Sequence, residues 1–459
     1  MTGRHPPASY SQLLFAACAM LVAVCLLGGC ADNEPDDGRI HLDYWEVWSG
    51  FERDAMQQLV NDFNASQDRI TINFLSVSQM ERKLLLATAG GNPPDIAGVR
   101  SADIPVFAEN GALTPLNRYA KLYGIAQDDY LPAVWNMINL HDRLWGLPTT
   151  PGNTALHWNK KLFREAGLDP DTPPKTIAEL EAINEQITRF NERGEIEVLG
   201  HLPSDPGWWQ DAWCYWFGGQ YWDGEQITAD APGNIRALTW IGTYPERFGR
   251  DKLLAFQDLS GNFASPQNPF FQGRIAMQIQ GPWMYNFINN FAPEDFEWGV
   301  APFPTEKPED YGVNVVETNL LVIPRGAKHP NAAFEFIAWM QQREHIEKLC
   351  LLQRKFSPLI QVSDTFYAEH PNPYIKIYRD LAADPRATAR PPLTTMHEYQ
   401  ADMNNANNSV SRAVATPAEA LGKVQQRQQK QFDRMQRRWN QVKETREAEW
   451  DALDQEAAR

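Results

Sequence analysis

After its first thirty residues, the chain lacks any apolar run long enough to span a membrane. The one long apolar run, residues 13–27, is short for a transmembrane helix and has the length of a signal-peptide core. Arg4 supplies the short basic start that such leaders carry. We therefore expect this segment to be a leader and the rest of the chain to be soluble.

Cysteine is scarce, with five residues in 459. Cys18 and Cys25 lie in the leader, and no pair has the spacing of a metal knuckle or a CxxC redox motif. Cys214 and Cys350 are far apart in the sequence. We interpret them as two buried small side chains, with one disulfide between them as the alternative.

Catalytic signatures and excess positive charge are also missing. The sequence has no nucleophile elbow, HExxH motif or phosphate loop, and Gly90-Gly91 lacks the spacing of GxGxxG. The formal net charge is −16, which argues against nucleic acid as a partner. We expect no metal or other cofactor.

The leader ends in Leu27-Gly28-Gly29-Cys30, which resembles the bacterial lipobox. In that signal the small residues admit the peptidase and the cysteine sulfur receives the lipid. The resemblance implies a signal peptide at 1–29, a lipid on Cys30 and a polar tether at 30–39. The protein would then be a membrane-anchored lipoprotein of the periplasm or cell surface. The alternative is an ordinary signal peptide or anchor helix with an incidental cysteine.

The chain after the tether alternates between strand and helix patterns. Strand-like segments at 40–45, 70–77 and 96–99 flank helical spacing at 52–64 and 79–89. This order is typical of a parallel α/β sheet with helices on both faces. Further strands are predicted at 274–279 and 315–323, and further helices at 175–191, 208–216 and 331–352.

The C-terminal part is strongly helical from Thr416 onward. Its apolar seam from Leu421 to Val442 lasts barely two heptads, so we expect packing against the same molecule in preference to a coiled coil. Residues 443–459 are charged on all sides and are predicted to be a solvated helical tail.

Eight short segments, in this order, resemble the family 1 extracellular solute-binding proteins, relatives of maltose-binding protein. The resemblance extends over about residues 40 to 440. The segments are Gly90–Ile96, Gly146–Pro148, Trp158–Phe163, Gly167–Asp169, Phe271–Met277, Gly281–Trp283, Trp298–Pro304 and Leu321–Ala327.

The resemblance implies an α/β fold of the periplasmic-binding-protein type II, with two lobes joined by crossing strands and a ligand cleft between them. Lobe I is expected at 40–150 plus 316–362, and lobe II with the C-terminal helices at 151–315 plus 363–442. The implied function is capture of a sugar or oligosaccharide by a monomer that hands it to the permease subunits of an ABC importer.

A sugar presents apolar C–H faces and a rim of hydroxyls, so its receptor needs flat aromatic rings and short polar groups. Sixteen tryptophans and fourteen tyrosines meet the first need. The family pattern puts Trp283 first among ligand contacts, because it follows Gly281-Pro282. The other candidates are Glu46, Trp48, Arg100, Ser101, Asp103, Thr150, Asn153, Trp208 and Glu317.

These residues also have simpler interpretations. Helical spacing places Trp209, Trp213 and Trp216 on one face, which we assign to the core, leaving Trp208 for the cleft. Glu317 accepts sugar hydroxyls or faces water, and Asp95 is expected to hold a turn.

Other functions remain open at this point. A glycosidase would need two facing carboxylates, for which Glu46, Asp95, Asp103 and Glu317 are candidates. A receptor for a polyamine would also suit the acidic, aromatic composition.

Overall fold

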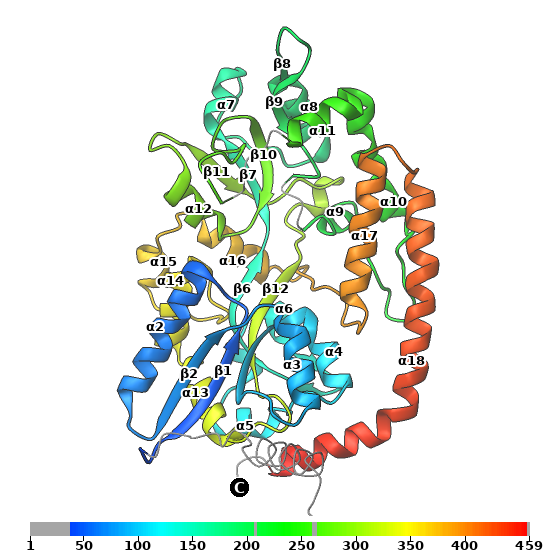
Figure 1. The fold of residues 1–459 in the computed structure, drawn as a ribbon. Coiled ribbons are helices and arrows are strands. Elements are labelled where there is room, and N and C mark those ends of the chain that lie inside the picture. The colour runs from blue at the N-terminus through cyan, green and yellow to red at the C-terminus, as the bar shows by residue number, and fades with distance from the viewer. Residues whose placement is uncertain (1–36, 206–208, 259–263, 457–459) are drawn as a thin grey trace, which may run out of the picture.

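The computed structural model describes residues 37–205, 209–258 and 264–456. Two lobes lie one above the other, each built on a five-stranded sheet (Figure 1). The predicted two-lobed α/β fold is confirmed. The predicted leader, tether start and lipidation residue Cys30 lie outside the described residues, as does Trp208. Within those ranges, every helix is too short or too polar to cross a bilayer.

Lobe I is a mixed sheet with strand order β2-β1-β3-β12-β6. Its first strands pair in parallel, and β12 runs antiparallel to both β3 and β6. The strands are β1 (Ile40–Glu46), β2 (Ile70–Ser76), β3 (Ile96–Arg100), β6 (Leu147–Asn153) and β12 (Val316–Val322), with a small hairpin of β4 (Asn139–Leu140) and β5 (Arg143–Leu144). Its helices are α2 (Gly50–Ser66), α3 (Met80–Ala89), α4 (Ile104–Glu109), α5 (Asn117–Leu122), α6 (Pro132–Met137), α13 (Pro330–Met340) and α14 (Arg343–Gln353).

Lobe II has strand order β11-β7-β10-β9-β8 and a separate apolar core. Its strands are β7 (Ala155–Asn159), β8 (Arg189–Phe190), β9 (Ile196–His201), β10 (Ile275–Gln280) and β11 (Trp298–Ala301). The elements around it are α7 (Lys160–Glu165), α8 (Ile177–Ile187), α9 (Ala212–Trp216), α10 (Pro232–Tyr244), α11 (Arg250–Asp258), α12 (Met284–Phe291) and α17 (Met396–Ser411). Helix α15 (Phe366–Glu369) packs against lobe I, and α16 (Ile375–Ala383) lies at the junction of the lobes.

Two paired strands connect the lobes. β6 leaves the first sheet and continues through Thr154 into β7 of the second, while β12 returns beside it. All seven residues of β6 are buried. The register places Glu317 opposite Gly152 and Val316 opposite Asn153, so side chains of the crossing strands lie between the lobes.

Three helix predictions differ from the structure. The expected helix at 208–216 begins only at Ala212, and residues 209–211 lie outside it. The expected helix at 331–352 is two helices, α13 and α14, because Gln342 adopts extended backbone (φ −62°, ψ 136°). The expected helix at 175–191 ends at Ile187, and Arg189–Phe190 form strand β8.

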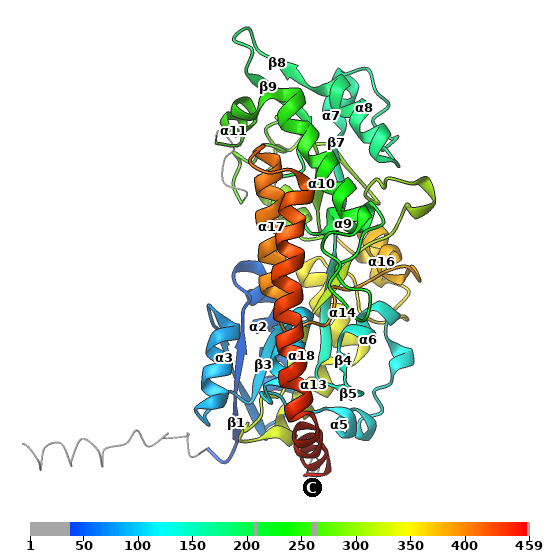
Figure 2. The same ribbon diagram turned by 90° about the vertical axis from the view of Figure 1, so that its right-hand side faces the viewer.

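The C-terminal helix α18 (Pro417–Glu456) continues through the predicted solvated tail. At 1.5 Å per residue its 40 residues span about 60 Å, past both lobes (Figure 2). Trp450 is 1% exposed and packs against Trp145 at 4.9 Å between ring centroids. Trp439 and Trp450 are eleven residues apart, three helical turns, so they share one face and bury it against lobe I. The prediction of a solvated tail was therefore wrong.

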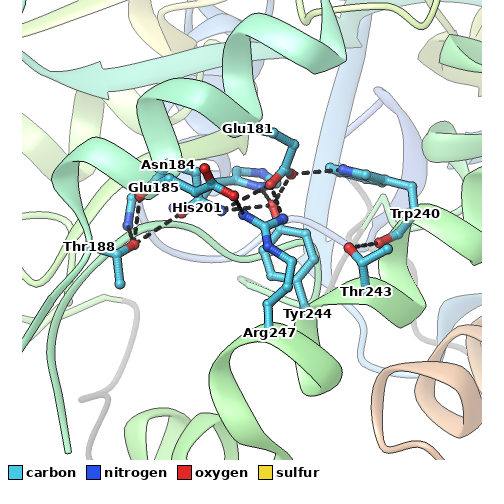
Figure 3. A network of polar contacts seen from close by, with 10 residues as sticks. Glu181, Asn184, Glu185, Thr188, His201, Trp240, Thr243, Tyr244 and Arg247 are labelled. Carbon is cyan, nitrogen blue, oxygen red and sulfur yellow. Dashed lines mark hydrogen bonds and ion pairs between the residues drawn. The ribbon is translucent and has the colours of Figure 1, made fainter. Parts of the chain in front are cut away.

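A buried polar network holds α8, β9 and α10 together inside lobe II (Figure 3). Glu181 accepts hydrogen bonds from Tyr244 Oη at 2.6 Å and Trp240 Nε1 at 2.7 Å, and it pairs with Arg247. Burial alone would raise the pKa of Glu181, but the bonds from Tyr244 and Arg247 outweigh it and lower that pKa. Burial lowers the pKa of His201 to about 4, so the ring is neutral beside Tyr244. The network has a structural role.

Replacing each of two helical glycines by alanine should have opposite effects on the free energy of unfolding. A Cβ at Gly233 would lie 2.5 Å from the backbone nitrogen of Gly219, whereas a Cβ at Gly422 meets nothing within 4 Å. We expect Gly233→Ala to lower the free energy of unfolding by roughly 1–3 kcal/mol through overpacking. Gly422→Ala should raise it by about 0.5–1 kcal/mol through helix propensity. Urea unfolding of both variants measures this, and equal effects in the two would contradict it.

Candidate functional site

The strongest sequence candidate, Trp283, lies between the lobes. It follows β10 and begins α12, and its ring lies over the backbone of two glycines. A Cβ on Gly281 would lie 2.2 Å from the ring, and one on Gly152 of β6 would lie 3.5 Å away. Trp283 Nε1 donates to Gln280 Oε1 at 3.2 Å. The ring is partly exposed and is held by close backbone contact on both a lobe II strand and a crossing strand.

Trp209 lies beside Trp283, with ring centroids 6.2 Å apart and planes tilted by 31°. Its backbone has φ +58°, in the left-handed region, which places it outside the turn of helix α9. Trp213 and Trp216 are buried in the lobe II core as predicted. Trp209 also packs against this core, but it is only partly buried, and its ring contacts Trp283 as well.

Arg390, which the sequence analysis missed, joins these aromatics to the crossing strands. Its guanidinium lies 4.6 Å from the Trp209 ring centroid, donates twice to Asp211 (2.7 and 3.2 Å) and once to Glu317 at 2.9 Å. Burial disfavours the charge, but Asp211 and Glu317 outweigh it and raise the pKa of Arg390. The predicted residue Glu317 is thus positioned by a buried cation.

The predicted loop after β3 contributes a second polar group. Ser101 Oγ accepts from the Thr318 backbone N–H at 3.2 Å, and Asp103 accepts from the Arg100 backbone N–H at 3.2 Å. Arg100 also pairs with Glu81 at 3.0 Å. Asp103 contacts His397 of α17, so a lobe I carboxylate meets a lobe II imidazole, and this hydrogen bond raises the pKa of His397.

A third group gathers where α2 begins and α14 ends. Lys355 Nζ lies 2.6 Å from Glu52 Oε1, 3.5 Å from Thr150 Oγ1 and 5.4 Å from the Trp48 ring centroid. Thr150 Oγ1 donates to Gln353 Oε1 at 2.9 Å. The predicted residues Trp48 and Thr150 are buried here, around a cation that the sequence analysis did not identify.

Two predicted residues serve the structure around the site. Asn153 is fully buried, and its Nδ2 donates to the Tyr378 carbonyl at 2.9 Å, which fixes α16 to the crossing strand. Asp95 holds its turn as predicted, accepting from the Asp43 backbone N–H at 3.1 Å and from that of His329 at 2.9 Å.

A cavity of about 100 Å³ lies where the loop after β3 meets the crossing strand β12 and the segment of Arg390. Ser101, Glu317 and Arg390 line it, together with residues 389–392 of the connecting segment. Among the described residues no cluster of three His, Cys, Asp or Glu side chains is arranged to hold a metal ion. Cys214 and Cys350 are both free and buried, and burial raises the pKa of Cys214 to about 12.

Glu46 is packed over Gly98, where a Cβ would lie 1.7 Å from its Oε2. Its carboxyl accepts from Tyr44 Oη at 2.7 Å and from the Val47 backbone N–H at 2.9 Å. Burial nevertheless raises the pKa of Glu46 to about 7, because these two bonds offset only part of the lost hydration.

The raised pKa of Glu46 makes stability depend on pH. The folded state binds the Glu46 proton more tightly than the unfolded state does, and this stabilises the fold most at pH values below the ordinary glutamate pKa of 4.5. The stabilisation is lost as pH rises through the folded-state pKa of about 7. From pH 5 to pH 8 the free energy of unfolding of the wild type should fall by ~2–3 kcal/mol more than that of Glu46→Gln. Urea unfolding at both pH values measures the difference. Glu197→Gln, at an exposed β9 position, is the control and should change stability equally at the two pH values.

The sequence is similar to known bacterial and archaeal binding proteins. A family model for bacterial extracellular solute-binding proteins matches residues 52–345. The maltotriose-binding protein of Pyrococcus abyssi is 24% identical over 341 residues, 72% of this chain and 68% of that protein. The arabinooligosaccharide-binding protein of Bacillus subtilis is 21% identical over 351 residues, 74% of this chain and 78% of that protein.

Solved structures match most of the chain, across both lobes. CpMnBP1 with mannobiose bound superposes with a TM-score of 0.75 at 27% identity, covering 84% of this chain and 99% of that one. The sugar-binding protein MalE of Xanthomonas citri, at 21% identity, has a TM-score of 0.72 over 87% of this chain and 98% of its own, and it shows the shared fold. Because the family model matches more than half of the sequence, this chain belongs to the bacterial extracellular solute-binding protein family.

Proposed function

We propose that this protein captures a sugar or short oligosaccharide between its lobes and delivers it to the permease of an ABC importer. The observation that carries the proposal is the partly exposed Trp283 ring, seated on Gly281 and Gly152 between the lobes. An indole held rigidly by backbone on one side is suited to stack on the C–H face of a sugar ring. The names of relatives support this chemistry, since they bind maltotriose, arabinooligosaccharides and mannobiose.

The polar groups near Trp283 suit the hydroxyl rim of such a ligand. Glu317 and Arg390 offer an acceptor and donors at one side, and Thr150 and Lys355 offer polar atoms at the other. Each charged group already has a partner, as in Arg390–Asp211 and Lys355–Glu52. Paired charges orient hydroxyls without demanding a charged ligand, so a neutral solute is favoured over a polyamine.

The mechanism we propose is closure of the lobes around the ligand. The cavity beside Glu317 and Arg390 measures about 100 Å³, which is smaller than the roughly 300–1,000 Å³ of ordinary small-molecule sites. A sugar therefore enters when the lobes separate and is enclosed when they return. Closure is stabilised because the ligand contacts both lobes at once, and this differential affinity shifts the equilibrium.

The contacts of the candidate catalytic carboxylates support a role in binding without catalysis. Among the four carboxylates considered for a glycosidase pair, Asp95 holds two backbone N–H groups and Asp103 contacts His397. Glu46 is buried over Gly98, and Glu317 is bonded to Arg390. We propose that all four orient structure or ligand and that none attacks a glycosidic bond.

Replacing Trp283 tests the proposed site. Trp283→Ala should weaken sugar binding by more than tenfold, roughly 1.4 kcal/mol, without unfolding the protein, because it removes the stacking face. Titration of tryptophan fluorescence with maltotriose, mannobiose, arabinooligosaccharides and spermidine gives the affinities, and product analysis detects cleavage. Trp339→Ala, on the outer helix α13, is the matched control and should retain affinity. Unchanged affinity in Trp283→Ala would remove the site assignment, and turnover of the sugar would overturn the binding-protein proposal.

We also propose that Cys30 carries a lipid that holds this monomeric receptor at the periplasmic or outer surface of a membrane, near its importer. The support is the Leu-Gly-Gly-Cys sequence after an apolar core and the polar residues that follow. Cys30→Ser should move the protein from the detergent phase to the aqueous phase in a detergent-partition assay of cells that express it. A wild-type protein found wholly in the aqueous phase would refute the anchor.

A further inference from the structure

Helix α18 is anchored in both lobes. Its first half packs against α10 and α17, with Leu421, Val424 and Phe432 in the lobe II core. Hydrogen bonds add to this anchor: Gln429 Oε1 accepts from the Ile227 backbone N–H, and Gln425 accepts from the Ala229 N–H and donates to the Ile227 carbonyl. This end of α18 therefore moves with lobe II.

The far end of α18 is anchored in lobe I. Trp439 and Trp450 belong to the lobe I core, and Trp439 stacks on His141 at 4.4 Å between ring centroids. Polar contacts surround the aromatic pair: Arg325 pairs with Glu449 at 3.0 Å, Arg143 pairs with Asp451, and the Arg118 backbone N–H donates to Asp454 at 3.0 Å. These contacts fix the C-terminal end of the helix to lobe I.

Between the two anchors the helix crosses the seam of the lobes. Phe432 and Trp439 are seven residues apart, about 10 Å along the helix, and residues 436–438 between them are exposed. A cavity of about 220 Å³ lies under this span. His141 of lobe I, Trp222 of lobe II and Trp439 of α18 all line it. The crossing span is therefore an exposed helical link, which the bond from Arg438 Nη2 to Asn110 Oδ1 at 3.3 Å ties to lobe I.

The lobes touch each other in this arrangement. Asp103 of lobe I contacts His397 of lobe II, and the rings of Phe51 and Phe287 meet edge to face at 6.3 Å. These direct contacts hold the lobes against each other, and we refer to this arrangement as closed. Both ends of α18 are docked in this closed state.

We propose that α18 is an intramolecular strap that favours the closed arrangement before any ligand binds. Opening rotates the lobes about the crossing strands, and α18 lies to one side of them (Figure 1). A continuous helix cannot follow that rotation with both ends docked, so it must bend or release an anchor. The cost falls on the open state alone and shifts the equilibrium toward closure. This inference goes beyond the proposed function and does not depend on which solute is bound.

Breaking the helix between its anchors tests the strap. Arg437 is exposed in the crossing span, and Arg437→Pro removes a helical hydrogen bond and clashes with the preceding turn while both anchors keep their residues. Arg437→Ala removes the same charge and keeps the helix, so it is the matched control. Trp450→Ala is the second variant, because it loosens the lobe I anchor without altering the span.

The readout is the distance between lobes in the full chain without ligand. Spin labels on cysteines that replace Leu86 of α3 and Phe190 of β8, both exposed, report it by pulsed dipolar spectroscopy in a Cys30→Ser background. The wild type and Arg437→Ala should give one narrow distance distribution. Arg437→Pro should add a second population at another distance, roughly threefold or more above any such signal in Arg437→Ala.

Circular dichroism shows which variant is folded and can be used for the distance measurement. If Arg437→Pro keeps the helical signal of the control apart from a local loss, its distance distribution tests the strap. If Arg437→Pro does not fold, the distance distribution of Trp450→Ala tests it instead. A second population in the deciding variant supports the strap, and a distribution that overlays that of Arg437→Ala overturns it. Because no ligand is present, failure of the sugar-binding proposal leaves this result unaffected.

Discussion

The pairing of β6 with β12 between the lobes is the constraint on which the rest of the structure depends. β6 is buried along its whole length and passes directly into β7, so both sheets share one continuous stretch of chain. Gly152 on β6 lies under Trp283, and Glu317 opposite it is bonded to Arg390. The candidate site is therefore built on the hinge itself. Any rotation of the lobes changes the distances among these residues, which links ligand contact to lobe position.

The charges around that hinge are buried in pairs. Arg390 lies between Asp211 and Glu317, and Lys355 contacts Glu52. Buried ion pairs contribute little net stability, because desolvation offsets much of the attraction, but removing one partner is strongly destabilising. Their clearest effect here is geometric: they fix carboxylate and guanidinium groups in one orientation. A site with fixed hydrogen-bonding directions and balanced charges selects a neutral, hydroxylated solute by shape and bond direction.

Much of the fold followed from local periodicity. The alternation of strand and helix through residue 100 identified β1 to β3 with α2 and α3: α2 buries one regular face, and β3 is a short, almost wholly buried apolar run. The motif around Gly281 identified Trp283, where close backbone approach requires glycine. Local patterns failed at Trp209, whose left-handed backbone removes it from the expected helix face.

The residues that were missed come from the last quarter of the chain. Lys355, Arg390 and His397 follow no motif, and their partners Glu52, Asp211 and Asp103 are far away in sequence. A single sequence carries no signal that joins such positions, because the pairing exists only after the connecting segments cross between the lobes. Trp450 was hidden for a related reason: one aromatic among charged residues has no periodic neighbours unless it is compared with Trp439, three turns away.

The separation of the two cores explains why α18 matters for motion. Lobe I and lobe II bury largely distinct sets of apolar residues, so rotating one lobe against the other disturbs little of either core. A third apolar cluster joins the lobes beside the crossing strands, where Val134 of α6 packs with Val300 of β11 and Tyr378 of α16. Helix α18 also bridges the lobes, because it contributes Leu421 and Phe432 to one core and Trp439 and Trp450 to the other. It couples the packing free energy of both cores to their relative position, which the crossing strands alone do not.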